Sequence, residues 1–127
     1  MTRIYKLRGF ARFQHKERIS DASLRNAIGG VEAGLVDADL GGGVVKQRLA
    51  RAGQGKSGSY RAVIAMKRGD RAVFLYGFAK NERSNIDADE LEEFRRLARG
   101  FLGLTVQQIA TLIAENELME VTDDDDR

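Results

Sequence analysis

The sequence predicts an α+β fold, because helical, strand-like and again helical patterns follow one another along its 127 residues. Apolar residues recur at helical spacing in the first third, and short apolar runs separated by glycine turns fill the middle third. In the last third, a second amphipathic pattern follows a helix-capping signal. The length suits one domain, and a hydrophobic content of 43% is enough for a packed core.

The N-terminal third is expected to contain a brief strand at residues 4–7, a short helix over about residues 10–19 and a longer helix after it. Ser20 or Asp21 can cap the longer helix. Its apolar positions follow helical spacing, and they are Ala22, Leu24, Ala27, Ile28, Val31 and Leu35. The glycine run at 41–43 then predicts a break in regular structure.

The middle of the chain is expected to form a sheet. A first strand begins around Val44, and further strands cover residues 60–66 and 72–79. Gly69-Asp70 predicts a tight turn between the last two strands, which would form a hairpin. The nearly continuous apolar composition of residues 72–78 is typical of a central strand.

The last third is expected to return to helix. Asp87 is a good N-cap, and Glu90 three residues later completes a capping-box pattern. The buried stripe of this helix comprises Leu91, Phe94, Leu97, Ala98, Phe101 and Leu102. Thr105 can cap another helix through about Glu115, and residues 117–121 suit an edge strand. We expect one domain over residues 1–121, with a core at 3–103, an extension at 104–121 and a disordered acidic tail at 122–127.

Charge is distributed unevenly along the chain although the net charge is only +2. Residues 1–83 carry 17 Lys and Arg against 7 Asp and Glu, whereas residues 84–127 carry 4 against 12. Between residues 40 and 69 there are seven basic residues and no acidic one. Such a stretch predicts a polyanionic partner, with neutralisation by the acidic C-terminal part as the alternative.

Several function classes are disfavoured by composition. The absence of cysteine excludes disulfides and thiolate chemistry, no metal-ligand cluster is evident, and we expect no cofactor. The chain has no apolar run of bilayer length and no signal-peptide pattern, so we expect a cytoplasmic protein. The run from Ala50 to Ser57 fits only the loosest P-loop pattern, and a predicted strand follows it instead of a helix. His15, the single histidine, cannot supply a two-histidine acid–base pair.

Basic residues are expected to converge at one end of the sheet. If residues 60–79 pair around Gly69-Asp70, Arg61 and Lys80 face each other or nearly so. Lys46, Arg48 and Lys56 can join them, and Tyr76 and Phe78 are available for stacking. Such a cluster suits metal-independent RNA cleavage, because arginines bind phosphate oxygens and lysines stabilise charge or move protons. The alternative is that Arg61 and Arg83 form ordinary ion pairs with Glu82, Asp87 or Glu90.

Two segments resemble a known family. The run from Gly43 through the glycine-rich turn to Arg61, and the run Tyr76-Gly-Phe-Ala-Lys-Asn-Glu-Arg-Ser-Asn-Ile86, resemble the HigB-like branch of the RelE/ParE toxin superfamily over about residues 3–103. This resemblance implies N-terminal helices packed on a small, mainly antiparallel twisted sheet, followed by C-terminal helices. It also implies an mRNA interferase that cleaves mRNA in the ribosomal A site by attack of the ribose 2′-hydroxyl.

The resemblance assigns expected roles to individual residues. It places Arg61 at the scissile phosphate, with Lys80, Arg83 and Lys56 as further catalytic residues. The expected RNA-binding residues are Lys46, Arg48, Arg51, Tyr76, Phe78 and Asn81. The chain departs from the family pattern at Asn81, where many members carry arginine, and near Asp87, where several carry a catalytic tyrosine. The general acid and base are therefore left unassigned.

The resemblance also implies partners, namely the ribosome, its mRNA and a cognate antitoxin, expected to be a helix-turn-helix protein of the HigA type. A homodimer is left open. Two alternatives remain: a ParE-type toxin that poisons DNA gyrase, and a non-catalytic RNA-binding module, for which Asn81 is the argument. Cleavage of mRNA would distinguish the mRNA interferase from both alternatives.

Overall fold

The computed structural model describes residues 2–50, 60–83 and 85–122, which form a mixed α+β fold. The elements in chain order are β1 (Arg3–Leu7), α1 (Arg8–Lys16), α2 (Asp21–Glu32), β2 (Ala38–Gly41), β3 (Val44–Leu49), β4 (Tyr60–Lys67), β5 (Arg71–Ala79), α3 (Ala88–Leu102), α4 (Val106–Ala114) and β6 (Leu118–Val121). The six strands form one sheet in the order β2-β3-β4-β5-β1-β6. All neighbours are antiparallel except β1 and β5. The predicted fold class is confirmed.

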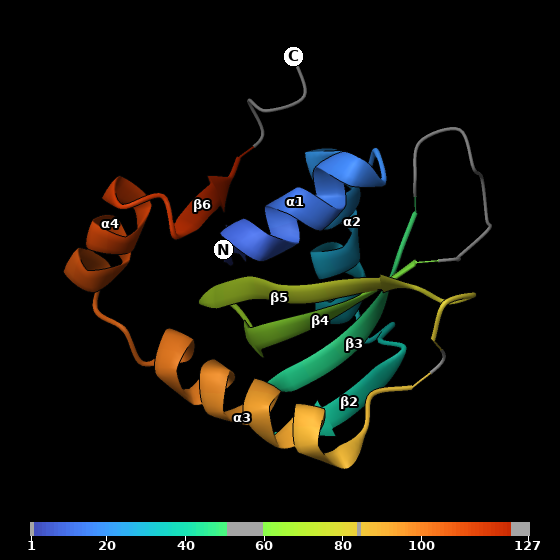
Figure 1. The fold of residues 1–127 in the computed structure, drawn as a ribbon. Coiled ribbons are helices and arrows are strands. Elements are labelled where there is room, and N and C mark those ends of the chain that lie inside the picture. Colours follow the sequence, from blue (N-terminus) through green and yellow to red (C-terminus); the bar gives the residue numbers. More distant parts are fainter. Residues whose placement is uncertain (1, 51–59, 84, 123–127) are drawn as a thin grey trace.

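Helices cover both faces of the sheet (Figure 1). On one face, α1 packs against β5 and α2 against β3, and their core includes Phe10, Leu24, Ile28 and Phe74. On the other face, α3 crosses β3, β4 and β5, and its core includes Val63 and Ala98. Because both faces are covered, β4 is buried along nearly its whole length, as expected of a central strand.

Local capping explains where three helices begin. The Ser20 side chain accepts a hydrogen bond from the Ser23 backbone at the start of α2. Asp87 and Glu90 form a complete capping box at the start of α3, and Thr105 and Gln108 form another at α4. Each box satisfies backbone N–H groups that the helix itself leaves unpaired. The predicted caps are confirmed.

Three predictions around the N-terminal helices need correction. The longer helix ends at Glu32, because the chain turns at Gly34 with a φ of 85°, and Leu35 is therefore 73% exposed instead of buried. The shorter helix starts at Arg8, directly after β1, and ends at Lys16. The glycine run at 41–43 is not a break, because it forms the turn of an unpredicted hairpin between β2 and β3. All three glycines have positive φ, which favours residues without a Cβ.

The predicted hairpin of β4 and β5 is confirmed, but its register contains a β-bulge. Val63 pairs with Tyr76 and Ile64 with Phe74, so Leu75 is the extra residue on β5. A bulge of this kind changes which residues of the strand point to each face. As a result, Leu75, Tyr76 and Phe78 all contribute to the core beneath α3, whereas Phe74 and Ala79 belong to the opposite core.

The C-terminal tail, the P-loop-like run and possible membrane-spanning helices can also be compared with the structure. Of the predicted disordered tail at 122–127, Thr122 is described and its carbonyl accepts a hydrogen bond from Arg25, while residues 123–127 lie outside the described residues. Nearly all of the P-loop-like run also lies outside them. The first described residue after that run, Tyr60, begins β4, so a strand follows where a P-loop requires a helix. Among the described residues, no single helix is long and apolar enough to cross a bilayer, although α3 and α4 together pass that test across a 110° bend.

Candidate functional site

The basic residues gather where β3 and β5 end and β4 begins, a region we name the basic sheet end. It comprises Lys46, Arg48, Arg61, Tyr76 and Phe78 from the strands and Lys80, Asn81 and Arg83 from the segment after β5. Arg61 pairs with Arg48 on one side and with Phe78 on the other, while Val63 pairs with Lys46 and Tyr76. Directly opposed residues point to the same face of a sheet. All five strand residues therefore lie on the face that α3 covers.

The register corrects the predicted pairing of Arg61 with Lys80. Tyr60 pairs with Ala79, the last residue of β5, and Arg61 pairs with Phe78. Lys67 pairs with Arg71, so the hairpin is centred on Gly69 and a regular ladder would pair Arg61 with Gly77. The bulge at Leu75 moves the partner of Arg61 to Phe78, which is still two residues before Lys80. Both cations lie at the same end of the sheet, but Arg61 is 7% exposed, whereas Lys80 lies at the surface.

Arg61 and Lys46 share one carboxylate, that of Asp37. The Arg61 Nε lies 3.3 Å from Asp37 Oδ2, and Lys46 Nζ lies 3.7 Å from the same oxygen. Asp37 precedes β2 and was not among the predicted site residues or the predicted ion-pair partners. One signal could have identified it: two strands joined at the glycine run would place the residue before the first strand beside Gln47 and Arg48.

Gln47 positions this carboxylate from within the protein. Its side chain is 5% exposed, and its Oε1 accepts a hydrogen bond of 3.2 Å from the Asp37 backbone N–H. Its Nε2 donates to the carbonyls of Ala27 in α2 and Leu35 in the following loop, at 3.2 and 2.9 Å. Buried amide groups are costly to leave unpaired, so this network fixes the loop that carries Asp37.

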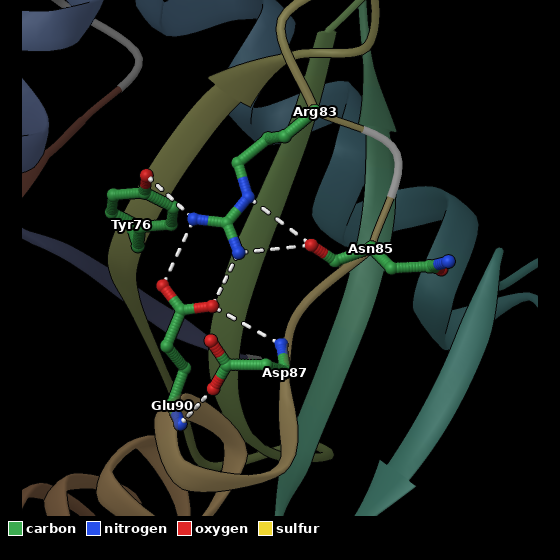
Figure 2. Close-up of polar contacts among 5 residues, drawn as sticks. All are labelled: Tyr76, Arg83, Asn85, Asp87 and Glu90. Atoms are coloured by element: carbon green, nitrogen blue, oxygen red, sulfur yellow. Dashed lines mark hydrogen bonds and ion pairs between the residues drawn. The ribbon is translucent and has the colours of Figure 1, made fainter.

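Arg83 is held by a second carboxylate, that of Glu90 in α3 (Figure 2). The guanidinium also donates to the Asn85 carbonyl and lies 3.4 Å from the Tyr76 hydroxyl. The hydrogen bond from Arg83 lowers the pKa of Glu90 from 4.5 to about 2, and the same bond raises the pKa of Arg83. The alternative for Arg83, an ordinary ion pair, is therefore the arrangement found.

The aromatic residues of β5 are largely covered. The Arg83 guanidinium carbon lies 5.9 Å from the ring centre of Tyr76 and 5.7 Å from that of Phe78, within the range of a cation–π contact. Phe78 is 4% exposed, and Tyr76 packs against Phe94 of α3 with 5.7 Å between the two ring centres. The prediction that Phe78 is available for base stacking is not supported by this arrangement, because Arg83 and the core occupy its ring. Tyr76 is only partly buried.

The surface of the basic sheet end carries Arg48, Lys80 and Asn81, all exposed. Within the described part of the chain, neither Arg48 nor Lys80 has a carboxylate within ion-pair distance. Two predicted site residues, Arg51 and Lys56, lie outside the described residues. His15 is exposed on α1, and the described residues contain no group of three His, Asp or Glu side chains suited to a metal ion.

A hollow of about 470 Å³ lies beside β5 and adds residues that the sequence did not single out. It is lined by Tyr76, Gly77, Phe78, Glu82 and Arg83 together with Arg12, Phe13, Lys16 and Glu17 of α1. Strand β1 pairs with β5 only as far as Phe74, so the chain beyond that point faces α1 instead of another strand. Exposed Arg12 and Lys16 thus extend the positive surface from the sheet to α1.

Comparison with known proteins agrees with this architecture. A search of curated proteins found no match. A family profile described as the RelE toxin of the RelE/RelB toxin–antitoxin system matches residues 2–121, a range that includes every helix and strand of the described residues. The chain therefore belongs to the RelE toxin family.

Proposed function

We propose that this protein is a HigB-like toxin that cleaves mRNA in the ribosomal A site. The observation that carries the proposal is the gathering of basic side chains at the basic sheet end, with Arg48 and Lys80 exposed and Lys46 partly exposed. A one-sign surface of this kind attracts the phosphates of a nucleic acid. Family membership supports a toxin that acts with an antitoxin, and toxins of this family typically cleave mRNA.

The proposed reaction is attack of a ribose 2′-hydroxyl on the adjacent phosphate without a metal ion. The 2′-hydroxyl must lose a proton, the pentacovalent phosphorane must be stabilised, and the leaving 5′-oxygen must gain a proton. Arginine and lysine side chains can stabilise the phosphorane, because they place positive charge where negative charge develops. We assign this role to Arg61 and Lys46, with Lys56 as a further candidate.

The exposed residues have a different proposed role. Arg48, Lys80 and Asn81 lie at the surface, so they would contact the RNA backbone first and set its path. Arg51 and Tyr76 complete the proposed RNA-binding set, whereas Phe78 is left out because its ring is buried. Arg83 would contribute to catalysis only after it exchanges Glu90 for a phosphate, because its guanidinium is already engaged.

The proposed partners follow from the charge of the site. An antitoxin of the HigA type, with a helix-turn-helix domain, would cover the basic sheet end through an acidic segment. The ribosome would position the mRNA. Mixing the purified toxin and antitoxin and measuring RNA cleavage tests this arrangement, since the antitoxin should abolish cleavage at a one-to-one ratio.

The central experiment uses programmed ribosomes and a defined mRNA. Wild-type protein should cut the message in the A site in the presence of a chelator and leave a 2′,3′-cyclic phosphate or its 3′-phosphate hydrolysis product. Arg61→Ala should lose most of this activity, while Arg96→Ala on the solvent side of α3 should retain it. Growth arrest upon expression should follow the same order.

Two outcomes would point to other functions. DNA breaks that depend on gyrase, with intact mRNA, would indicate a ParE-type toxin. Salt-sensitive RNA binding without cleavage would indicate a regulatory RNA-binding module, an alternative consistent with Asn81 and with the engaged state of Arg83.

A further inference from the structure

The basic sheet end contains one carboxylate that no step of the reaction above uses. Asp37 accepts both of its ion pairs, from Arg61 and Lys46, at the same oxygen, Oδ2. Among the described residues, its other oxygen, Oδ1, has no hydrogen-bond or ion-pair partner. The Asp37 side chain is 26% exposed and that of Lys46 is 18% exposed, so solvent reaches this pair while Arg61 lies beneath it.

The position of Asp37 is fixed by its backbone anchor as well as by its two cations. The buried Gln47 binds the Asp37 backbone N–H and is itself held by carbonyls of Ala27 and Leu35. A carboxylate with a backbone anchor keeps its place when a phosphate competes for the neighbouring cations. Catalytic groups need support of this kind, because small displacements from the productive geometry reduce the rate strongly.

We propose that Asp37 is the general base that activates the ribose 2′-hydroxyl, an inference that rests on the proposed ribonuclease function. A phosphate bound by Lys46 and Arg61 has its neighbouring ribose beside the same carboxylate. Cleavage of RNA needs a proton acceptor within hydrogen-bond reach of the 2′-hydroxyl. Asp37 contacts both phosphate-binding cations through Oδ2, its side chain is 26% exposed, and Oδ1 keeps a lone pair open for the proton.

The proton and bond changes balance without a further reactant except water. Asp37 takes the proton of the 2′-hydroxyl, and the resulting oxygen forms a bond to phosphorus. The bond between phosphorus and the 5′-oxygen breaks, and water protonates the leaving oxygen. The products are a 2′,3′-cyclic phosphate and a 5′-hydroxyl, and Asp37 later returns its proton to solvent.

The test compares Asp37→Asn with the wild type on programmed ribosomes. Asparagine keeps the shape and can still accept a hydrogen bond from Arg61, but it cannot accept the proton. We expect single-turnover cleavage to fall about 100-fold or more. Binding to a non-cleavable RNA that lacks the 2′-hydroxyl at the cut site should stay within about threefold, since the phosphate-binding cations remain. Asp39→Asn is the matched control, because Asp39 bonds only the Gly41 N–H among the described residues and should cleave normally.

Two measurements separate a general base from a positioning residue. The wild-type rate should rise with pH on the acid side, and this rise should be absent in Asp37→Asn. The charged groups that face Asp37 are Lys46 and Arg61, and both are present in the wild type and in the variant. Formate should restore part of the cleavage by Asp37→Gly, because a small carboxylate can occupy the vacated place. Thermal unfolding of each variant shows whether it is folded at the assay temperature.

The possible outcomes are distinct. Normal cleavage by Asp37→Asn overturns the inference and leaves the proposed ribonuclease function intact. A parallel loss of binding and cleavage, with no rescue by formate, also overturns it and makes Asp37 a positioning residue for Arg61. If the wild type itself fails to cleave RNA, the proposed function fails, and the inference fails with it.

Discussion

Arg61 and Arg83 lie at the same end of the sheet, and within the described residues each pairs with a carboxylate, yet their surroundings differ. Arg61 projects from the central strand β4, is 7% exposed and pairs with Asp37. Arg83 follows β5, lies over two aromatic rings and pairs with Glu90, with 29% of its side chain exposed. The first arginine is fixed in place beside Asp37, whereas the second has the solvent access needed to exchange one anion for another.

The partners of the two arginines differ in the same way. Asp37 is anchored by a buried glutamine, and its partner Arg61 is itself buried, so removal of Asp37 would leave a buried positive charge without this carboxylate. Glu90 is anchored by a capping box at the surface, where ion pairs contribute little to stability. The comparison therefore assigns Arg61 to a preformed site and Arg83 to a site that forms when RNA binds.

The largest expected effect concerns cleavage by arginine variants. Arg61→Ala should lower single-turnover cleavage about 100- to 1,000-fold, the range seen when one donor to a developing anion is removed. Arg83→Ala should lower it less than about tenfold, because Arg83 must first leave Glu90. Cleavage assays on programmed ribosomes measure both, with Arg96→Ala as control. Equal losses would remove the distinction between the two arginines.

The next effect concerns the support of Asp37. Gln47→Leu leaves the Asp37 N–H and two carbonyls without their partner and should destabilise the protein by about 2 kcal/mol. Denaturant unfolding measures the change, and Gln107→Leu on the exposed side of α4 is the control. A change no greater than that of the control would mean that the Gln47 network does not fix the Arg61 region.

Acid should weaken the Arg83 region through Glu90. Because the pKa of Glu90 is lowered from 4.5 in the unfolded chain to about 2 in the folded protein, its contribution to stability is present above pH 4.5 and is lost as the pH falls toward 2. Glu90→Gln keeps the capping-box geometry but should lack this part of the pH dependence. Unfolding curves between pH 2 and 5 measure it, with Glu92→Gln, which removes an exposed carboxylate of the same helix, as the control. A Glu90→Gln profile identical to the wild type would contradict the pairing.

The smallest effect concerns the exposed cations. Arg48→Ala and Lys80→Ala should each weaken RNA binding a few-fold. Each should also reduce the slope of log affinity against log salt by about 0.7 for every phosphate that the variant no longer neutralises. Filter binding to a non-cleavable RNA at several salt concentrations measures the slope. Arg99→Ala, an exposed cation elsewhere on α3, should leave it unchanged. If Arg48→Ala and Lys80→Ala also leave the slope unchanged, the RNA binds away from the basic sheet end.

Local sequence signals predicted much of the fold and part of the candidate site. The turn at Gly69-Asp70, the capping box of Asp87 and Glu90 and the cap at Thr105 all depend on residues within a few positions of one another. The same signals placed Arg61 at the start of β4 and Lys80 just after β5. The proposed roles of these residues in RNA cleavage remain predictions.

Other features could not be predicted because they depend on distant parts of the chain. The bulge at Leu75 reverses which residues of β5 face α3, and nothing in the local alternation of residues 72–79 marks it. The pairing of Arg61 with Asp37 joins β4 to the segment before β2, across the hairpin formed by the glycine run at 41–43. A glycine run has the same appearance in a sequence whether it interrupts structure or forms a turn.

The sequence by itself determined the order of helices and strands apart from β2, and the excess of positive charge in residues 1–83, since periodicity, caps and composition are local properties. Only the tertiary structure determined which of these basic side chains are buried and which carboxylates they contact. Packing of α3 and the register of the sheet bury Arg61 beside Asp37 and place Arg83 against Glu90. Arg61 and Asp37 are far apart in the chain, and strand register and helix packing bring them together. Their spacing in the sequence therefore could not predict the pair.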